Sequence, residues 1–163
     1  MALRIAVGAD SAGVQYKDAL QRDLEADPRV AEVIDVGIVE GQDVDYPHVA
    51  VDAAKLVAAG KADRALLICG TGLGTAIAAN KVRGVRAVTA FDSYSVERSV
   101  LSNNAQVLCM GQRVVGLEVA RRMVREWLGY TFDPSSSSGP KVAAIESYDT
   151  GLVEAEADQQ SCS

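Results

Sequence analysis

A cysteine placed directly before a glycine-rich turn is the strongest chemical signal in this sequence. Cys69 is followed by GTGLG, residues Gly70–Gly74, and an alanine-rich segment comes after the turn. A glycine turn that leads into a helix presents free backbone N–H groups, which attract phosphate, carboxylate or enolate oxygens. The field of such a helix also favours the thiolate form of a cysteine at its start. The segment can therefore abstract a proton and stabilise the negative charge that results.

The elements that must position this turn alternate between strands and helices. Apolar runs predict strands at Leu3–Ala9, Val30–Val36, Ala65–Ile68, Val85–Ala90 and Val107–Met110. Helical patterns are found at Tyr16–Leu24, Pro47–Ala59, Ala76–Ala79, Ser93–Leu101, Val114–Leu128 and Lys141–Tyr148. This alternation predicts a Rossmann-like, doubly wound α/β fold, with a five-stranded parallel sheet covered on both faces. We expect one domain with a C-terminal helical extension.

In a doubly wound sheet, ligands bind at the carboxyl ends of the strands, near a topological switch point. A strand order of 2-1-3-4-5 places that point between the first and third strands. Asp10 and Ser11 would then adjoin the turn after Cys69. On the same argument we expect Ser102-Asn103 and Arg113 near the same edge of the sheet.

Length, composition and charge narrow the class of protein. The chain has 163 residues with 48% hydrophobic content, which suits one domain over residues 1–150. A net charge of −6 argues against a nucleic-acid partner. The polar, acidic residues 151–163 are expected to be a disordered tail.

The sequence also predicts a cytoplasmic protein without a membrane partner. It has no apolar run long enough to cross a bilayer, and its start reads directly as a strand instead of a signal peptide. Cys69, Cys109 and Cys162 are widely spaced, with no zinc or CxxC pattern. We therefore expect a reducing compartment, with Cys109 in the core.

Each candidate residue also has an ordinary structural interpretation. Cys69 can be a small buried hydrophobe, and Asp10 can be the N-cap of a helix. Asn103 suits a polar turn, and Arg113 can be a surface arginine.

A nicotinamide-dependent oxidoreductase is the main rival interpretation of the glycine turn. Gly70 and Gly72 fit the first two positions of a GxGxxG fingerprint, and Asp92 ends the next predicted strand. The third glycine, however, is replaced by Thr75, and the turn follows the third strand instead of the first. Nicotinamide binding is therefore the minority interpretation.

Several short motifs occur along the chain in an order that is specific as a set. They are Gly8-Ala9-Asp10, Asp45-Tyr46-Pro47, Cys69–Gly74, Ala78–Lys81, Asn103 and Gly111–Gly116. This set resembles the type B ribose-5-phosphate isomerases and the related galactose-6-phosphate isomerases, up to about Tyr148. The resemblance implies a Rossmann-like aldose–ketose isomerase that uses no metal or cofactor and works on a phosphorylated sugar through a cis-enediolate. It also implies a homodimer or a dimer of dimers, in which each active site is built from two chains.

The resemblance assigns catalytic roles within the glycine turn. Cys69 is similar to the base that moves a proton between C1 and C2, and Thr71 to the hydroxyl that helps proton transfer at the substrate oxygens. The residues similar to the enediolate cradle are Gly70, Gly72, Gly74 and Asn103.

Contacts to the rest of the substrate follow from the same resemblance. Asp10 and Tyr46 are similar to sugar contacts, and Arg113 to a phosphate ligand. Near the C-terminus the family places arginine and histidine on phosphate, whereas only Lys141 keeps a charge here. Lys141 and nearby serine hydroxyls would then complete the phosphate site together with Arg113.

Two serines depart from the pattern of the ribose-5-phosphate enzymes. Ser11 and Ser102 stand where those enzymes usually carry histidine, and the second histidine is assigned to opening the furanose ring. Its loss favours a tetrose 4-phosphate, which cannot close a furanose ring. The run from Val96 to Asn104 resembles that of the D-erythrulose 4-phosphate isomerases. Ribose 5-phosphate remains the alternative substrate, and a sugar-phosphate-binding module without turnover is the alternative class.

Overall fold

A parallel five-stranded sheet forms the centre of the molecule in the computed structural model, which describes residues 1–39 and 41–149. Its strands are β1 (Leu3–Ala9), β2 (Val30–Asp35), β3 (Arg64–Cys69), β4 (Ala87–Thr89) and β5 (Val107–Gly111). The helices between them are α1 (Val14–Glu25), α2 (Tyr46–Ala58), α3 (Leu73–Ala79), α4 (Ser93–Leu101) and α5 (Leu117–Trp127). The predicted Rossmann-like α/β class is thus confirmed. The tail predicted at residues 151–163 lies outside the described residues.

The order of the strands, β2-β1-β3-β5-β4, differs from the expected 2-1-3-4-5. β5 is buried along its whole length, whereas β4 has three residues and is only partly buried. A short, partly buried strand belongs at the edge of a sheet, and a fully apolar one belongs inside it. The switch point between β1 and β3 is where we expected it, but the strand beside β3 is β5.

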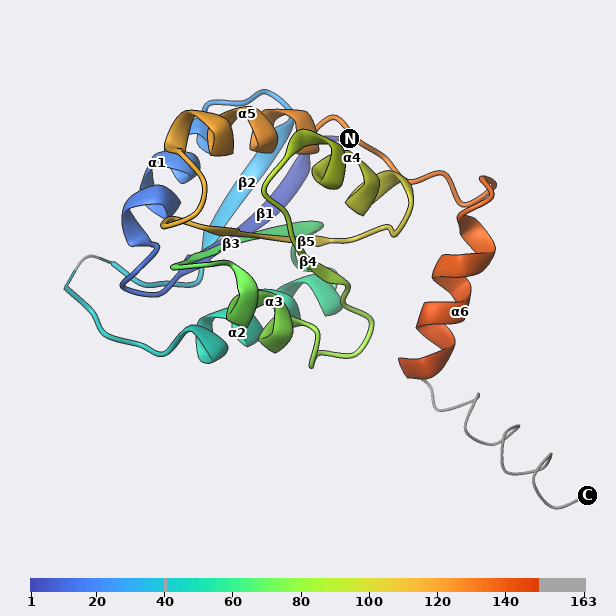
Figure 1. The fold of residues 1–163 in the computed structure, drawn as a ribbon, viewed down its shortest axis with the longest axis horizontal. Coiled ribbons are helices and arrows are strands. Elements are labelled where there is room, and N and C mark those ends of the chain that lie inside the picture. Colours follow the sequence, from blue (N-terminus) through green and yellow to red (C-terminus); the bar gives the residue numbers. More distant parts are fainter. Residues whose placement is uncertain (40, 150–163) are drawn as a thin grey trace, which may run out of the picture.

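The helices cover the two faces of the sheet with different side chains. α1, α4 and α5 pack on one face, and α2 and α3 on the other (Figure 1). The first face is filled by large residues such as Leu20, Met123 and Trp127. The second is filled mainly by alanines, so α2 and α3 lie close to the strands.

A last helix, α6 (Gly139–Asp149), extends the domain at its C-terminal end, and Figure 1 shows it standing beside the sheet layers. Val142 is buried, and Arg86 forms a 2.9 Å ion pair with Glu146. The backbone N–H of Gly84 donates to the Asp149 carboxylate at 2.8 Å. These contacts confirm the predicted helical extension.

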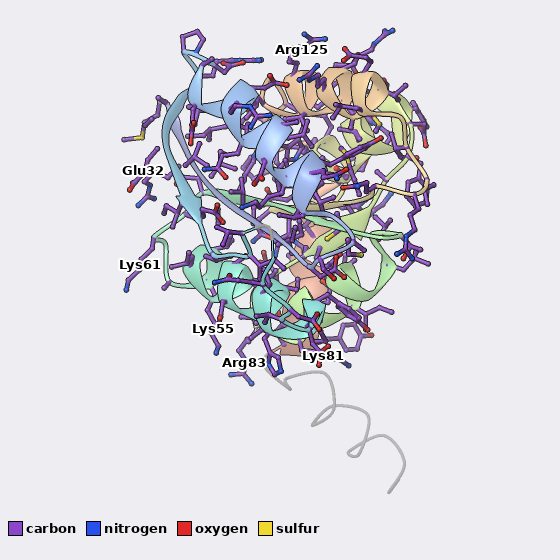
Figure 2. All side chains as sticks on the ribbon, turned by 90° about the vertical axis from the view of Figure 1, so that its left-hand side faces the viewer. Glu32, Lys55, Lys61, Lys81, Arg83 and Arg125 are labelled. Carbon is purple, nitrogen blue, oxygen red and sulfur yellow. The ribbon has the colours of Figure 1, made fainter. Side chains whose placement is uncertain are left out.

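Charged side chains project outward around the body. Figure 2 shows this for Glu32, Lys55, Lys61, Lys81, Arg83 and Arg125. Within the described part of the chain, every helix is too short or too polar to span a bilayer.

Candidate active site

The turn between β3 and α3 depends on glycine for its shape. Gly72 has a φ of +79°, the left-handed region that glycine enters without strain. A Cβ on Gly72 would lie 2.8 Å from the carbonyl carbon of Met110, which is backbone and cannot rotate away. The turn therefore packs directly on β5.

Cys69 occupies the last position of β3, and its side chain faces the turn. It is only 4% exposed. Its Sγ accepts a hydrogen bond from the Gly72 N–H at 3.0 Å and lies 3.6 Å from Oγ1 of Thr75. A backbone donor directed at sulfur is the arrangement that a catalytic thiolate requires.

The segment after β5 brings a cation over the turn. The N–H of Gln112 donates to the Cys69 carbonyl at 2.9 Å, and the N–H of Arg113 donates to the Gly70 carbonyl at 3.0 Å. The Arg113 guanidinium consequently covers Gly70, with Nη1 3.4 Å from where a Cβ on Gly70 would be. The predicted proximity of Arg113 and Cys69 is confirmed, because β5 lies next to β3.

Asp10 follows β1 at the same edge of the sheet. Its Oδ1 accepts from the N–H of Ala12 at 3.0 Å, while the N-cap of α1 is Gly13. The N-cap interpretation of Asp10 is therefore wrong. Ser11 and Arg113 both line a cavity of about 340 Å³ beside this segment. The cavity offers room for a polar group next to the turn.

Tyr46 reaches the turn from the opposite side, at the start of α2. A Cβ on Gly74 would lie 2.5 Å from ring carbon Cε2 of Tyr46, so the aromatic ring lies against the glycine backbone. Thr71 is exposed, and its Oγ1 accepts from the N–H of Leu73 at 3.3 Å. Side chains of Cys69 on β3, Tyr46 on α2 and Arg113 after β5 thus contact the turn.

Ser102, Asn103 and Lys141 do not join this cluster within one chain. Ser102 and Asn103 precede β5, whereas Cys69 pairs with Gly111 at the other end of that strand. The expectation that they lie at the Cys69 edge is wrong for a single chain, because α4 leads into β5 at its amino end. Lys141 is exposed on α6.

Two threonines that we did not single out as functional bond to the glycine turn. Oγ1 of Thr75 donates to the Gly72 carbonyl at 3.2 Å, and Oγ1 of Thr89 donates to the same oxygen at 2.7 Å. Thr75 stands alone as a polar residue in an alanine-rich helix, which could have drawn attention to it. The edge position of Thr89 beside the turn could not be read from the sequence.

Asp92 fails as the acid of a dinucleotide site. Its carboxylate accepts from the backbone N–H and from the hydroxyl of Ser95, each at 2.7 Å, and so caps α4. These bonds lower the pKa of Asp92. Asp92 also follows β4, which is separated from β3 by β5. The geometry gives the nicotinamide interpretation no support.

Known proteins match nearly the whole described chain. The family model described as Ribose/Galactose Isomerase matches residues 5–145. D-erythrulose-4-phosphate isomerase 2 of Mycolicibacterium smegmatis is 67% identical over 150 residues, covering 91% of this chain and 99% of that protein. Ribose-5-phosphate isomerase B of Escherichia coli is 44% identical over 130 residues, covering 80% of this chain and 86% of that one.

A solved structure with the same fold covers a similar extent. Ribose-5-phosphate isomerase B of Clostridium thermocellum superposes with a TM-score of 0.86 at 37% identity. The superposition covers 92% of this chain and 99% of that one.

Proposed function

The chain belongs to the ribose/galactose isomerase family, and from that premise we propose that it interconverts D-erythrulose 4-phosphate and D-erythrose 4-phosphate. The observation that carries the chemistry is the buried Cys69 Sγ, which accepts a hydrogen bond from the Gly72 N–H in a turn whose Gly70 is covered by the Arg113 guanidinium. The identity of 67% to a D-erythrulose-4-phosphate isomerase supports the choice of sugar.

In the proposed reaction Cys69 is the base. Its thiolate removes a proton from C1 of the ketose, which leaves a cis-enediolate, and returns that proton to C2. The hydroxyl proton moves from O1 to O2 with the help of Thr71, so the product is an isomer of the substrate. Backbone donors of the turn, Gly70 to Gly74, stabilise the oxygen that becomes negative.

Arg113 and Ser11 are proposed to hold the phosphate, because both line the cavity beside the turn. A guanidinium binds phosphate with charge-assisted hydrogen bonds. Asp10, which follows β1 at the same edge of the sheet, and Tyr46, which lies against Gly74, are proposed to contact the sugar hydroxyls.

Ser102 favours a sugar that needs no ring opening. A serine hydroxyl is neither appreciably acidic nor basic near neutral pH, so it cannot replace a histidine that passes a proton to a ring oxygen. A pentose phosphate would therefore be limited by its small open-chain fraction. A tetrose 4-phosphate has no furanose to open, since its O4 is esterified.

A second copy of the chain is proposed to complete each site in a homodimer or a dimer of dimers. Ser102 and Asn103 lie before the amino end of β5, away from Cys69, and Lys141 lies on α6, so we propose that they serve the site of a partner. Leu73 and Ile77 on α3 are 53% and 64% exposed beside the glycine turn, which suits burial by another subunit. We also propose that the enzyme works in the reducing cytoplasm, because the catalytic thiol of Cys69 must stay unoxidised.

The experiment that tests this proposal is proton exchange in deuterated water with a panel of phosphorylated tetroses, pentoses and hexoses. NMR should detect deuterium at C2 of the aldose product. We expect kcat/KM for D-erythrulose 4-phosphate at least about tenfold above that for ribose 5-phosphate, which corresponds to about 1.4 kcal/mol. Ser102→His should narrow the gap.

Each outcome has a separate meaning. Equal or better turnover of ribose 5-phosphate would reject the tetrose 4-phosphate as the preferred substrate but would keep the assignment as an isomerase. Sugar-phosphate binding without exchange at C2 would reject catalysis in favour of a binding module.

A further inference from the structure

The peptide groups on either side of Gly72 are held by side chains from three elements. The N–H of Gly72 donates to Sγ of Cys69, at the end of β3, at 3.0 Å. The Gly72 carbonyl accepts from Thr75 of α3 at 3.2 Å and from Thr89, the last residue of β4, at 2.7 Å. The donor that serves the sulfur is therefore fixed in place.

Thr75 has one hydroxyl proton, which it can direct at the Gly72 carbonyl or at Sγ of Cys69, while the neutral Cys109 thiol is a third and weaker neighbour. Its Oγ1 lies 3.2 Å from the Gly72 carbonyl oxygen and 3.6 Å from Sγ of Cys69. A protonated thiol can donate to Oγ1 while Thr75 donates to the carbonyl. A thiolate can only accept, so the Thr75 hydroxyl must then turn its proton toward sulfur.

Thr89 makes that rotation possible at little cost. A buried carbonyl that loses its only side-chain donor leaves a polar group poorly satisfied, which is unfavourable. The Thr89 hydroxyl lies closer to the Gly72 oxygen than Thr75 does, at 2.7 Å. It keeps this oxygen hydrogen-bonded whichever way the Thr75 proton points.

We propose that Thr75 and Thr89 are positioning residues that stabilise the thiolate of Cys69, Thr75 by donating to the sulfur and Thr89 by releasing Thr75 to do so. This rests on the proposed function, in which Cys69 is the base. Thr75 is 1% exposed, so water does not replace its hydroxyl. Neither threonine touches the substrate in this proposal.

Ionisable groups on the neighbouring elements stay unchanged in the test. They are Cys109 on β5, Arg113 after β5, Asp10 after β1 and Tyr46 at the start of α2. Cys109 also hydrogen-bonds Thr75, and burial raises its pKa to about 12. It therefore stays a neutral thiol and does not compete for alkylating reagents.

The test is the pH dependence of Cys69 alkylation by iodoacetamide, followed by mass spectrometry in a Cys162→Ser background. Loss of a hydrogen bond to a charged acceptor in Thr75→Val should move the midpoint upward by about one pH unit, or about tenfold in thiolate at neutral pH. Thr75→Ser keeps the hydroxyl and should keep the wild-type midpoint. Thr89→Val should move it in the same direction by a smaller amount.

The double variant separates this proposal from a packing effect. Because both threonines act through one O–H group, Thr75→Val with Thr89→Val should shift the midpoint no further than Thr75→Val alone. An unchanged midpoint in Thr75→Val, an equal shift in Thr75→Ser, or additive shifts would overturn the proposal.

Thermal denaturation checks that the variants fold. If Thr75→Val does not fold, the alkylation midpoint of Thr89→Val is compared with that of the wild type. An unshifted midpoint in Thr89→Val then overturns the proposal. Alkylation needs no substrate, so the outcome is independent of the isomerase assignment. Absence of deuterium exchange at C2 in the unmodified protein would reject the proposed function alone.

Discussion

If each active site is shared between two chains, as we propose, activity should recover when two inactive variants are mixed. Cys69 pairs with Gly111 at the carboxyl end of β5, and that strand begins at Val107. Four residue steps of about 3.3 Å put the strand's amino end about 13 Å away, and Asn103 comes before it. Asn103 therefore cannot meet the Cys69 thiol of its own chain. If it contributes to catalysis, it does so in a partner's site.

Cys69→Ala and Asn103→Ala should each be nearly inactive alone. In a mixed dimer one site carries both substitutions and the other carries neither. Random exchange makes half of the dimers mixed, and half of their sites are intact, so activity should recover to about a quarter of wild type. The assay is turnover of the preferred sugar phosphate after subunit exchange, with mixing confirmed by native mass spectrometry.

Cys69→Ala mixed with Thr71→Ala is the matched control, because both substitutions lie in the same turn and no mixed dimer has an intact site. It should show no recovery. Confirmed mixed dimers of Cys69→Ala and Asn103→Ala without activity would refute the shared site. So would full activity of Asn103→Ala by itself.

Three further predictions concern catalysis, the turn and acid stability. Cys69→Ser should lower kcat by about 10²–10⁴-fold with an unchanged thermal midpoint, and near-normal turnover would reject Cys69 as the base. Gly72→Ala should destabilise the fold by at least about 1–2 kcal/mol in urea titrations, since its φ is positive and its Cβ would meet backbone. Gly74→Ala should instead raise KM and leave stability nearly unchanged, since the exposed Tyr46 ring can rotate away; equal stability losses would contradict this contrast. A hydrogen bond from Arg29 lowers the pKa of Asp27 from 3.8 to about 2. The Asp27 carboxylate therefore stabilises the fold above about pH 4, and this stabilisation is lost as the pH falls toward 2. The difference in thermal midpoint between wild type and Asp27→Asn should shrink over that range, and a constant difference would count against the ion pair.

The sequence predicted the elements better than their order. β1 and α4 have the predicted bounds, because a clean apolar run and a capped amphipathic run are local signals. α5 begins at Leu117 instead of Val114, because the residues after Gly111 turn back and bond to the Cys69 turn. Strand order depends on which strand is buried on both faces. That difference was visible in the uninterrupted apolar residues of β5, but we did not use it.

The site could be predicted where its residues are consecutive in sequence or directly follow a strand. Cys69 and its turn are consecutive in sequence, and Asp10 and Arg113 follow β1 and β5, the two strands that flank β3. Asn103 could not be placed correctly, because its edge of the sheet depends on the direction in which the chain enters β5. The contact of Thr89 with the Gly72 carbonyl depends on β4 lying at the sheet edge, which no local pattern specifies.

The alanine layer under α2 and α3 sets limits on how this protein can be re-engineered. Its helix residues are Ala50, Ala53, Ala54, Ala76, Ala78 and Ala79. These six positions carry only methyl side chains, and overpacking a closely packed core costs about 1–3 kcal/mol per insertion. Any enlargement there would also push α3, and the glycine turn with it, away from β5. A library for heat resistance should therefore vary the leucine and methionine face of the sheet and leave the alanine face as it is.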